Sequence, residues 1–140
     1  MSDERLLIDT AFIQALLNRN DQYHRVAQKL FPRIQAATEV WITEAVLLEI
    51  GNALSALNRE AAAAVIRQCY TAANLQVVRV TTALLMDALD LYEARPDKTW
   101  SLTDCVSFLV MDAQGLTVAV TTDRHFQQAG FRALMLEGGE

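Results

Sequence analysis

Four acidic residues of this chain stand where a carboxylate is costly to bury. Asp9 and Asp123 each follow a short apolar run. Glu49 and Asp104 each interrupt an apolar helical pattern. A carboxylate is expensive to remove from water unless a compensating group lies nearby. One such acid is explained by a cap or a local salt bridge, but four suggest that folding gathers them around hard cations, as in a metal-dependent hydrolase.

The chemistry of the cluster favours Mg²⁺ or Mn²⁺. These ions prefer oxygen ligands in octahedral geometry and keep several waters, so a few carboxylates from different elements suit them. Ions held in this way can activate water and stabilise the leaving oxygen of a phosphodiester. Their charge also offsets the repulsion by which neighbouring acids raise one another's pKa. The sequence therefore predicts that the four acids bind divalent metal.

Each aspartate also has a local alternative explanation. Asp9 and Asp123 both lie where an apolar strand gives way to a helix, so each is a good helix N-cap. Ser101 and Asp104 have the spacing of a capping box. In open α/β sheets, however, ligands bind beyond the carboxyl ends of strands, and two strands would deliver an aspartate to that edge. Capping and ligand binding both stay open for these residues.

Glu49 is surrounded on its helix by small or apolar residues, and no lysine or arginine lies within one turn of it. A solvent-facing position is the alternative to a place in the acidic cluster. Glu44 begins the same helix five positions earlier, roughly 140° around it. The two glutamates therefore point different ways, and Glu44 is typical of a first-turn residue favoured by the helix dipole.

Short apolar runs alternate with helical patterns along the chain. The runs that predict strands are 6–8, 40–42, 77–80, 118–120 and 133–136. Between them apolar residues recur at three- and four-residue spacing, as at Val26, Leu30 and Ile34. Nearly all-apolar strands are typical of a parallel sheet covered on both faces. We expect one domain, 1–140, with three α/β/α layers around a mainly parallel sheet of four to five strands.

Composition bounds the function less tightly. The chain has 140 residues, and 52% of them are hydrophobic with a mean hydropathy of +0.14, which indicates either a subunit interface or a well-filled helical core. The charged N-terminus and the short apolar runs predict neither a signal peptide nor a membrane helix. Cys69 and Cys105 lack metal-ligand spacing and fit free thiols in the cytoplasm. A net charge of −5 argues against nucleic acid unless bound metal reverses the local field.

Four segments in order resemble the PIN-domain nucleases, particularly the VapC-type ribonuclease toxins of prokaryotic toxin–antitoxin pairs. "LLIDTAF" resembles the opening strand with its aspartate, Asp9, and "TEAVLLEIGNAL" the helix with its glutamate, Glu49. "SLTDCVSFLVM" resembles the segment that carries the third acid, Asp104, and "VAVTTDRHF" the closing strand with the fourth, Asp123. The match runs nearly end to end.

The resemblance implies a Mg²⁺- or Mn²⁺-dependent endoribonuclease acting on single-stranded RNA. It also implies a homodimer and an antitoxin whose tail occludes the acidic pocket. The four acids would be catalytic metal ligands, Thr10 and Thr122 would support them, and Arg124 and His125 would contact the RNA backbone.

Two other classes are alternatives: a binding module, and another α/β fold with an acidic pocket such as a phosphatase or a receiver. A PIN-like module that only binds protein or RNA fits the apolar composition and the weak basicity. A haloacid-dehalogenase-like phosphatase would need a second aspartate at position 11, where the chain has Ala11. A phospho-accepting receiver would need paired acids and a late lysine near its pocket, and Lys98 is poorly placed for that role.

Overall fold

Five short parallel strands organise the chain, of which the computed structural model describes residues 3–137. In chain order they are β1 (Arg5–Ile8), β2 (Glu39–Thr43), β3 (Leu75–Val78), β4 (Val118–Val120) and β5 (Arg132–Ala133). Every neighbouring pair is parallel, in the order β3-β2-β1-β4-β5. The expected parallel sheet of up to five strands is therefore confirmed.

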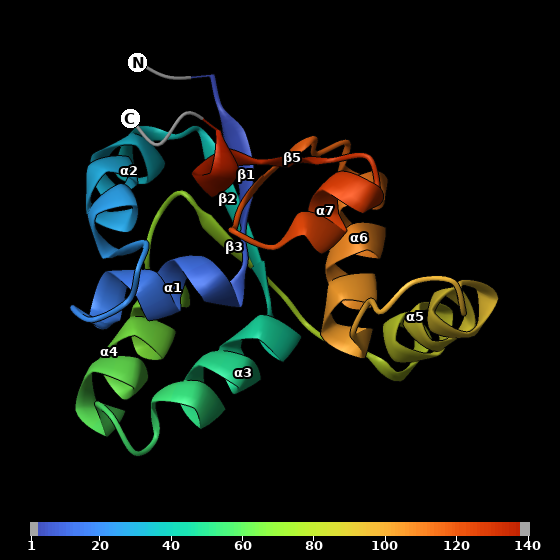
Figure 1. Cartoon of the computed structure of the whole chain (residues 1–140), viewed down its shortest axis with the longest axis horizontal. Helices are drawn as coiled ribbons and strands as arrows, with labels where there is room; N and C mark the ends of the chain where they lie inside the picture. The colour runs from blue at the N-terminus through green and yellow to red at the C-terminus, as the bar shows by residue number, and fades with distance from the viewer. Residues whose placement is uncertain (1–2, 138–140) are drawn as a thin grey trace.

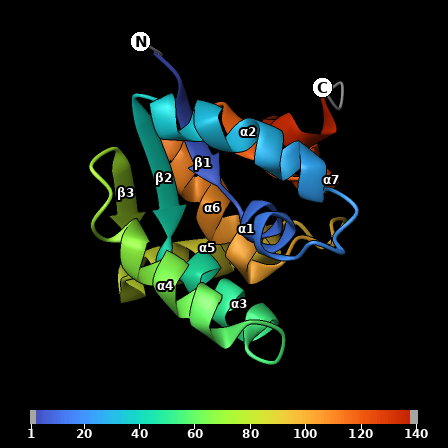
Figure 2. The same cartoon turned by 90° about the vertical axis from the view of Figure 1, so that its left-hand side faces the viewer.

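Helices cover both faces of this sheet. They are α1 (Thr10–Leu17), α2 (His24–Ala36), α3 (Glu44–Leu54), α4 (Arg59–Cys69), α5 (Thr82–Ala94), α6 (Leu102–Gln114) and α7 (Arg124–Gln128), with a final 3₁₀ turn η1 (Leu134–Leu136). Figure 1 shows α1, α2 and α4 on one side of the strands and α5, α6 and α7 on the other. Figure 2 looks onto the side covered by α1, α2, α3 and α4.

The side chains of the strands divide between two buried clusters. Leu6 and Ile8 of β1 pack with residues of α1 to α4, whereas Leu7 packs with residues of α5 to α7. In β4, Ala119 likewise faces the opposite cluster from Val118 and Val120. Successive side chains of a strand point to opposite faces, so nearly all-apolar strands need a helical layer on each side. The three-layer α/β/α architecture follows from this pattern.

The strand order places a topological switch point between β1 and β4. From β1 the chain moves outward through β2 to β3, then returns to place β4 on the other side of β1. Crossovers on the two sides of this point cover opposite faces of the sheet. A crevice therefore opens beyond the carboxyl ends of β1 and β4, where ligands of such sheets bind.

Two strand boundaries differ from the sequence-based expectation. The strand expected at 77–80 is Leu75–Val78, because its partner β2 ends at Thr43, which pairs with Val78 and then caps α3. The segment 133–136 is mainly the 3₁₀ turn η1, and only Ala133 pairs with β4. Its buried side chains explain its apolar sequence without a strand.

The expected domain, 1–140, extends at both ends beyond the described residues. Within those residues, no helix combines the length and apolar character that crossing a bilayer would require. Cys69 and Cys105 are both free and buried.

Candidate functional site

Asp9, Glu49, Asp104 and Asp123 line one hollow of about 700 Å³ at the switch point of the sheet. Asp9 follows β1, Glu49 lies in α3, Asp104 in the first turn of α6, and Asp123 between β4 and α7. We call this hollow the acidic pocket. Its remaining lining residues are Thr10, Ala11, Gln14, Asn52, Ala53, Ser101, Thr122 and His125.

Asp9 occupies the N-cap position of α1, but its side chain makes no capping hydrogen bond. Its Oδ2 instead accepts a hydrogen bond of 2.7 Å from the hydroxyl of Thr121, across the boundary between β1 and β4. Only 6% of Asp9 is exposed, and Thr121 is fully buried. Capping therefore does not explain this aspartate, which the sheet holds against the acidic pocket.

Glu49 is fixed by a hydroxyl from another helix. Thr10 Oγ1 donates to Glu49 Oε1 at 2.6 Å and so joins the start of α1 to the middle of α3. Thr10 is buried and Glu49 is half-buried. The residue that follows Asp9 in the chain thus orients a second acid of the same pocket.

Asp104 combines a structural contact with a place in the pocket. Ser101 and Asp104 form the expected capping box at the start of α6, with both hydrogen bonds at 3.0 Å. Asp104 Oδ2 also accepts from His125 Nδ1 at 2.9 Å, although the residue is only 6% exposed. The cap and the pocket are therefore compatible, since one carboxylate takes part in both.

Asp123 caps α7, because its Oδ1 accepts from the backbone N–H of His125 at 2.9 Å. The same oxygen lies 3.2 Å from His125 Nδ1. One potential ligand atom each from Asp104, Asp123 and His125 lies within 4.8 Å of the others. The imidazole of His125 is thus part of the acidic cluster.

Burial and mutual repulsion raise the pKa values of two of the acids, Asp9 and Asp104. Burial raises the pKa of Asp9 to about 7, and the negative charges of Asp104 and Asp123 add to the rise. The hydrogen bond from Thr121 offsets part of this effect. Burial likewise raises the pKa of Asp104, against hydrogen bonds from the Ser101 backbone and from His125 that lower it. The pocket therefore disfavours the ionised forms of Asp9 and Asp104.

The donor set of the acidic pocket fits a hard divalent cation. It offers four carboxylates and no thiolate, and oxygen ligands of this kind suit Mg²⁺ and Mn²⁺. No lysine or arginine is among the residues that line it. A cation held by these oxygens would favour the ionised forms that burial disfavours.

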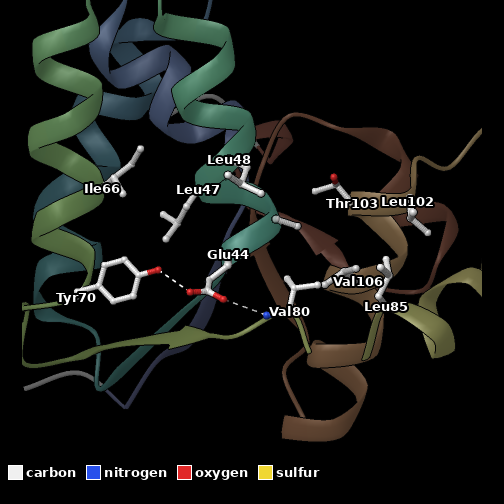
Figure 3. A pocket seen from close by; sticks show the side chains of 11 residues that line it. Glu44, Leu47, Leu48, Ile66, Tyr70, Val80, Leu85, Leu102, Thr103 and Val106 are labelled. Atoms are coloured by element: carbon white, nitrogen blue, oxygen red, sulfur yellow. Dashed lines mark hydrogen bonds between the residues drawn. The ribbon is translucent and has the colours of Figure 1, made fainter. Parts of the chain in front are cut away.

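Glu44 lies in a different hollow, of about 640 Å³, between α3 and α4 on one side and α5 and α6 on the other. Its Oε2 accepts from the Tyr70 hydroxyl at 2.8 Å and its Oε1 from the Val80 backbone N–H at 3.2 Å (Figure 3). The other side chains around it are mostly apolar, among them Leu48, which is 71% exposed. We call this second hollow the apolar groove.

The structure also places the residues expected to assist the acids. Thr10 bonds to Glu49, whereas Thr122 lines the acidic pocket without a hydrogen bond to any carboxylate of the described residues. Sequence reasoning did not select Thr121, the partner of Asp9. His125 faces Asp104 and Asp123, and Arg124 is exposed beside them. Contact of these last two residues with RNA stays a prediction.

Thr121 is recognisable only once the strand order is known. Ile8 pairs with Val120, so the next residues, Asp9 and Thr121, leave the sheet side by side. Thr43 and Thr122 also follow or lie near strand ends, and nothing in the sequence ranks one hydroxyl above another.

Comparison with known proteins identifies the family to which this fold belongs. Residues 6–132 match the family model of the PIN domain. The chain is 29% identical over 136 residues to the 23S rRNA-specific endonuclease VapC20 of Mycobacterium tuberculosis. The alignment covers 90% of this chain and 95% of that protein.

Solved structures give the same result. A crystal structure of M. tuberculosis VapC20, described as a sarcin–ricin loop cleaving toxin, matches with a TM-score of 0.80 and 27% identity over 90% of this chain and 95% of that one. DNA-bound VapBC from Salmonella typhimurium shares the fold, with a TM-score of 0.62 and 20% identity over 95% and 97% of the two chains. Since the family model spans most of the sequence, the chain belongs to the PIN-domain family.

Proposed function

We propose that this chain is a Mg²⁺- or Mn²⁺-dependent endoribonuclease that hydrolyses phosphodiester bonds of single-stranded RNA, as the toxin of a VapBC-type pair. The observation that carries the proposal is the convergence of four carboxylates, from segments far apart in the sequence, on one open pocket at the switch point. The VapC20 relative, named as an rRNA endonuclease, supports RNA as the substrate.

In this proposal Asp9, Glu49, Asp104 and Asp123 hold the metal. A bound divalent cation supplies positive charge that assists deprotonation of the attacking water and stabilises the charge that builds up on the phosphate oxygens. The hydroxyls of Thr121 and Thr10 fix the orientation of Asp9 and Glu49. Outer hydrogen bonds of this kind commonly tune a metal site.

The direct test is cleavage by the purified chain. With Mn²⁺, the wild type should cut members of a single-stranded RNA panel that includes 23S rRNA, the substrate named for the relative. Asp9→Asn should abolish cleavage while leaving the chain folded, because it removes a ligand and relieves repulsion between acids. A wild type that cuts no RNA and binds no Mn²⁺ would favour a non-catalytic PIN-like binding module.

We further propose a homodimer and an antitoxin as protein partners. The apolar groove, with Leu48 and Tyr70 more than half exposed at its edge, supports a protein contact, since exposed apolar patches usually mark one. Solved complexes of VapBC from other organisms support the antitoxin. Light scattering after gel filtration should report a dimer, and Leu48→Glu should weaken one of these two assemblies.

We also propose that the chain is a single PIN-like domain and that it acts in the cytoplasm. One sheet organises all the described elements, and two free buried thiols fit a reducing compartment. Fractionation of cells that express the chain would test the location.

A further inference from the structure

A third hollow, of about 340 Å³, lies between the end of α5 and the segment that leads into α6. Tyr92, Arg95, Lys98, Thr99 and Trp100 are among the residues that line it. We call it the 92–100 hollow. Figure 1 shows the connection from α5 to α6 on the side of the molecule opposite α2.

The 92–100 hollow adjoins the acidic pocket. Thr99 lines the former and His125 the latter, and a hydrogen bond of 3.1 Å joins Thr99 Oγ1 to His125 Nε2. Trp100 and Ser101, consecutive in the chain, also line one hollow each. The 92–100 hollow is therefore a neighbouring site for a polymer that lies across the four acids.

The two hollows offer different chemistry. The acidic pocket is lined by carboxylates and repels phosphate, so RNA needs a hold outside it. Two cationic residues, Lys98 and Arg95, line the 92–100 hollow. Among the described residues, Glu93 is the one acid of that lining. The hollow also presents the ring of Tyr92, which is 49% exposed. Flat aromatic and guanidinium surfaces with nearby cations are what single-stranded nucleic acid stacks on.

The wall of this hollow is held in place by its own contacts. The Arg95 guanidinium lies 5.0 Å from the centre of the Trp100 ring and makes two hydrogen bonds, of 3.0 and 2.9 Å, to Asp97. Trp100 Nε1 donates to Gln128 Oε1 at 3.0 Å, and the ring packs edge-on against Phe108. A surface that is already ordered loses little entropy when a ligand binds.

We propose that the 92–100 hollow binds the RNA nucleotide next to the scissile phosphate. Its base stacks on Tyr92 and Arg95, and its phosphate pairs with Lys98. The inference rests on the proposed ribonuclease function and adds a subsite to it. Asp97 lies 3.9 Å from Lys98 Nζ as well as bonding to Arg95, so a phosphate would share Lys98 with this carboxylate. Stacking therefore contributes more to this subsite than net charge does.

Binding of RNA by the full chain tests the subsite. The probe is a fluorescein-labelled single-stranded RNA of mixed sequence, followed by anisotropy with Mn²⁺ in the Asp9→Asn background. Adding Tyr92→Ala should weaken binding about tenfold, within the range that loss of one base–aromatic stack gives. Tyr92→Phe keeps the ring and should restore the affinity.

Salt dependence separates the second contact from the first. Lys98→Ala should make the slope of log affinity against log salt shallower by about 0.7, the value for one phosphate contact of a single strand. Tyr92→Ala should leave the slope unchanged. The matched controls are Phe31→Ala and Lys29→Ala on α2, an exposed aromatic and an exposed cation on the other side of the molecule, and both should match the parent.

The outcomes distinguish this inference from the function on which it rests. If wild type binds and cuts RNA while the Tyr92 and Lys98 variants match their α2 controls, the subsite is refuted and the ribonuclease stands. If wild type neither binds nor cuts RNA, the function fails and the subsite with it. All four substituted side chains are partly or largely exposed, so thermal unfolding should confirm intact folds.

Discussion

Helix α3 carries two glutamates whose side chains line different hollows, Glu44 the apolar groove and Glu49 the acidic pocket. Glu44 lies in the apolar groove and accepts hydrogen bonds from Tyr70 and from the backbone of Val80. Glu49, five residues later, lies in the acidic pocket with three aspartates and accepts a hydrogen bond from Thr10. The 140° between them around the helix is enough to separate the two sites.

The difference shows how a structural carboxylate can be told from one available for chemistry. Donors surround Glu44, so its negative charge is compensated within the fold. Glu49 shares its pocket with other acids and with no lysine or arginine. Like charges that are only partly compensated cost stability, and a fold keeps such a cost where function requires it. The acidic pocket is therefore the site that a cation would complete.

The largest expected effect separates the two glutamates by activity. Glu49→Gln should lower the rate of RNA cleavage with Mn²⁺ by at least about 100-fold. Loss of an outer hydrogen bond to a metal ligand costs up to about 100-fold, and Glu49 is proposed to be a ligand itself. Glu44→Gln, the matched control on the same helix, should cleave like wild type. Equal losses in both variants would contradict the division between the sites.

Stability against pH tests the burial of Asp9. Folding raises its pKa from 3.8 to about 7, so between these values the folded chain holds a proton that the unfolded chain releases. The free energy of unfolding of the metal-free chain therefore falls as the pH rises through this window, and the full penalty is present above it. Asp9→Asn removes the penalty and should stabilise the chain by on the order of a few kcal/mol at pH 8.

The same variant should gain much less stability at pH 5, where wild-type Asp9 is largely protonated. Thermal unfolding in EDTA at the two pH values measures the difference. An equal gain at both would mean that Asp9 does not titrate within this window.

Substituting Glu44 should lower the free energy of unfolding more than substituting Glu49 does, which is the reverse of their order in activity. Glu44→Ala leaves the Val80 N–H and the Tyr70 hydroxyl without their acceptor, which should cost about 1–3 kcal/mol. Glu49→Ala removes one acid from a repelling cluster and should cost less. Urea unfolding of the metal-free variants compares them, and a larger loss for Glu49→Ala would show that the acidic pocket stabilises the fold.

The smallest expected effect concerns the hydroxyls. Thr10→Val keeps the shape of the side chain but removes the hydrogen bond to Glu49, and should lower cleavage about tenfold, as outer contacts of metal sites do. Thr122→Val, in the same pocket but without such a bond, should have less effect. If Thr122→Val has the greater effect, the assignment of supporting residues from the hydrogen bonds is wrong.

Much of the fold was predictable because buried strands are recognisable as apolar runs in the sequence. The apolar runs at 6–8, 40–42 and 118–120 lie in β1, β2 and β4, and their lack of alternation indicated helices on both faces. The run at 133–136 is equally apolar but mainly forms η1. Apolar composition reports burial, and it does not distinguish a short strand from a buried turn.

The acids of the site were predictable for a related reason, since carboxylates among apolar neighbours are unusual. The choice of Glu49 over Glu44 used the small and apolar helical neighbours of Glu49, the first-turn position of Glu44 and the family resemblance. Ranking Thr121 above Thr122 needed the place of β4 beside β1, which no local pattern gives. The apolar groove arises from packing between helices and the 92–100 hollow from the path of the segment between α5 and α6, so the sequence did not indicate them.

Calorimetric titration with Mn²⁺ tests the central claim most directly. Wild type should bind the ion with saturable heat, and Asp104→Asn should lose most of that binding while keeping its fold. Absence of heat in the wild type, or an unchanged titration in Asp104→Asn, would contradict the assignment of the acidic pocket as a metal centre.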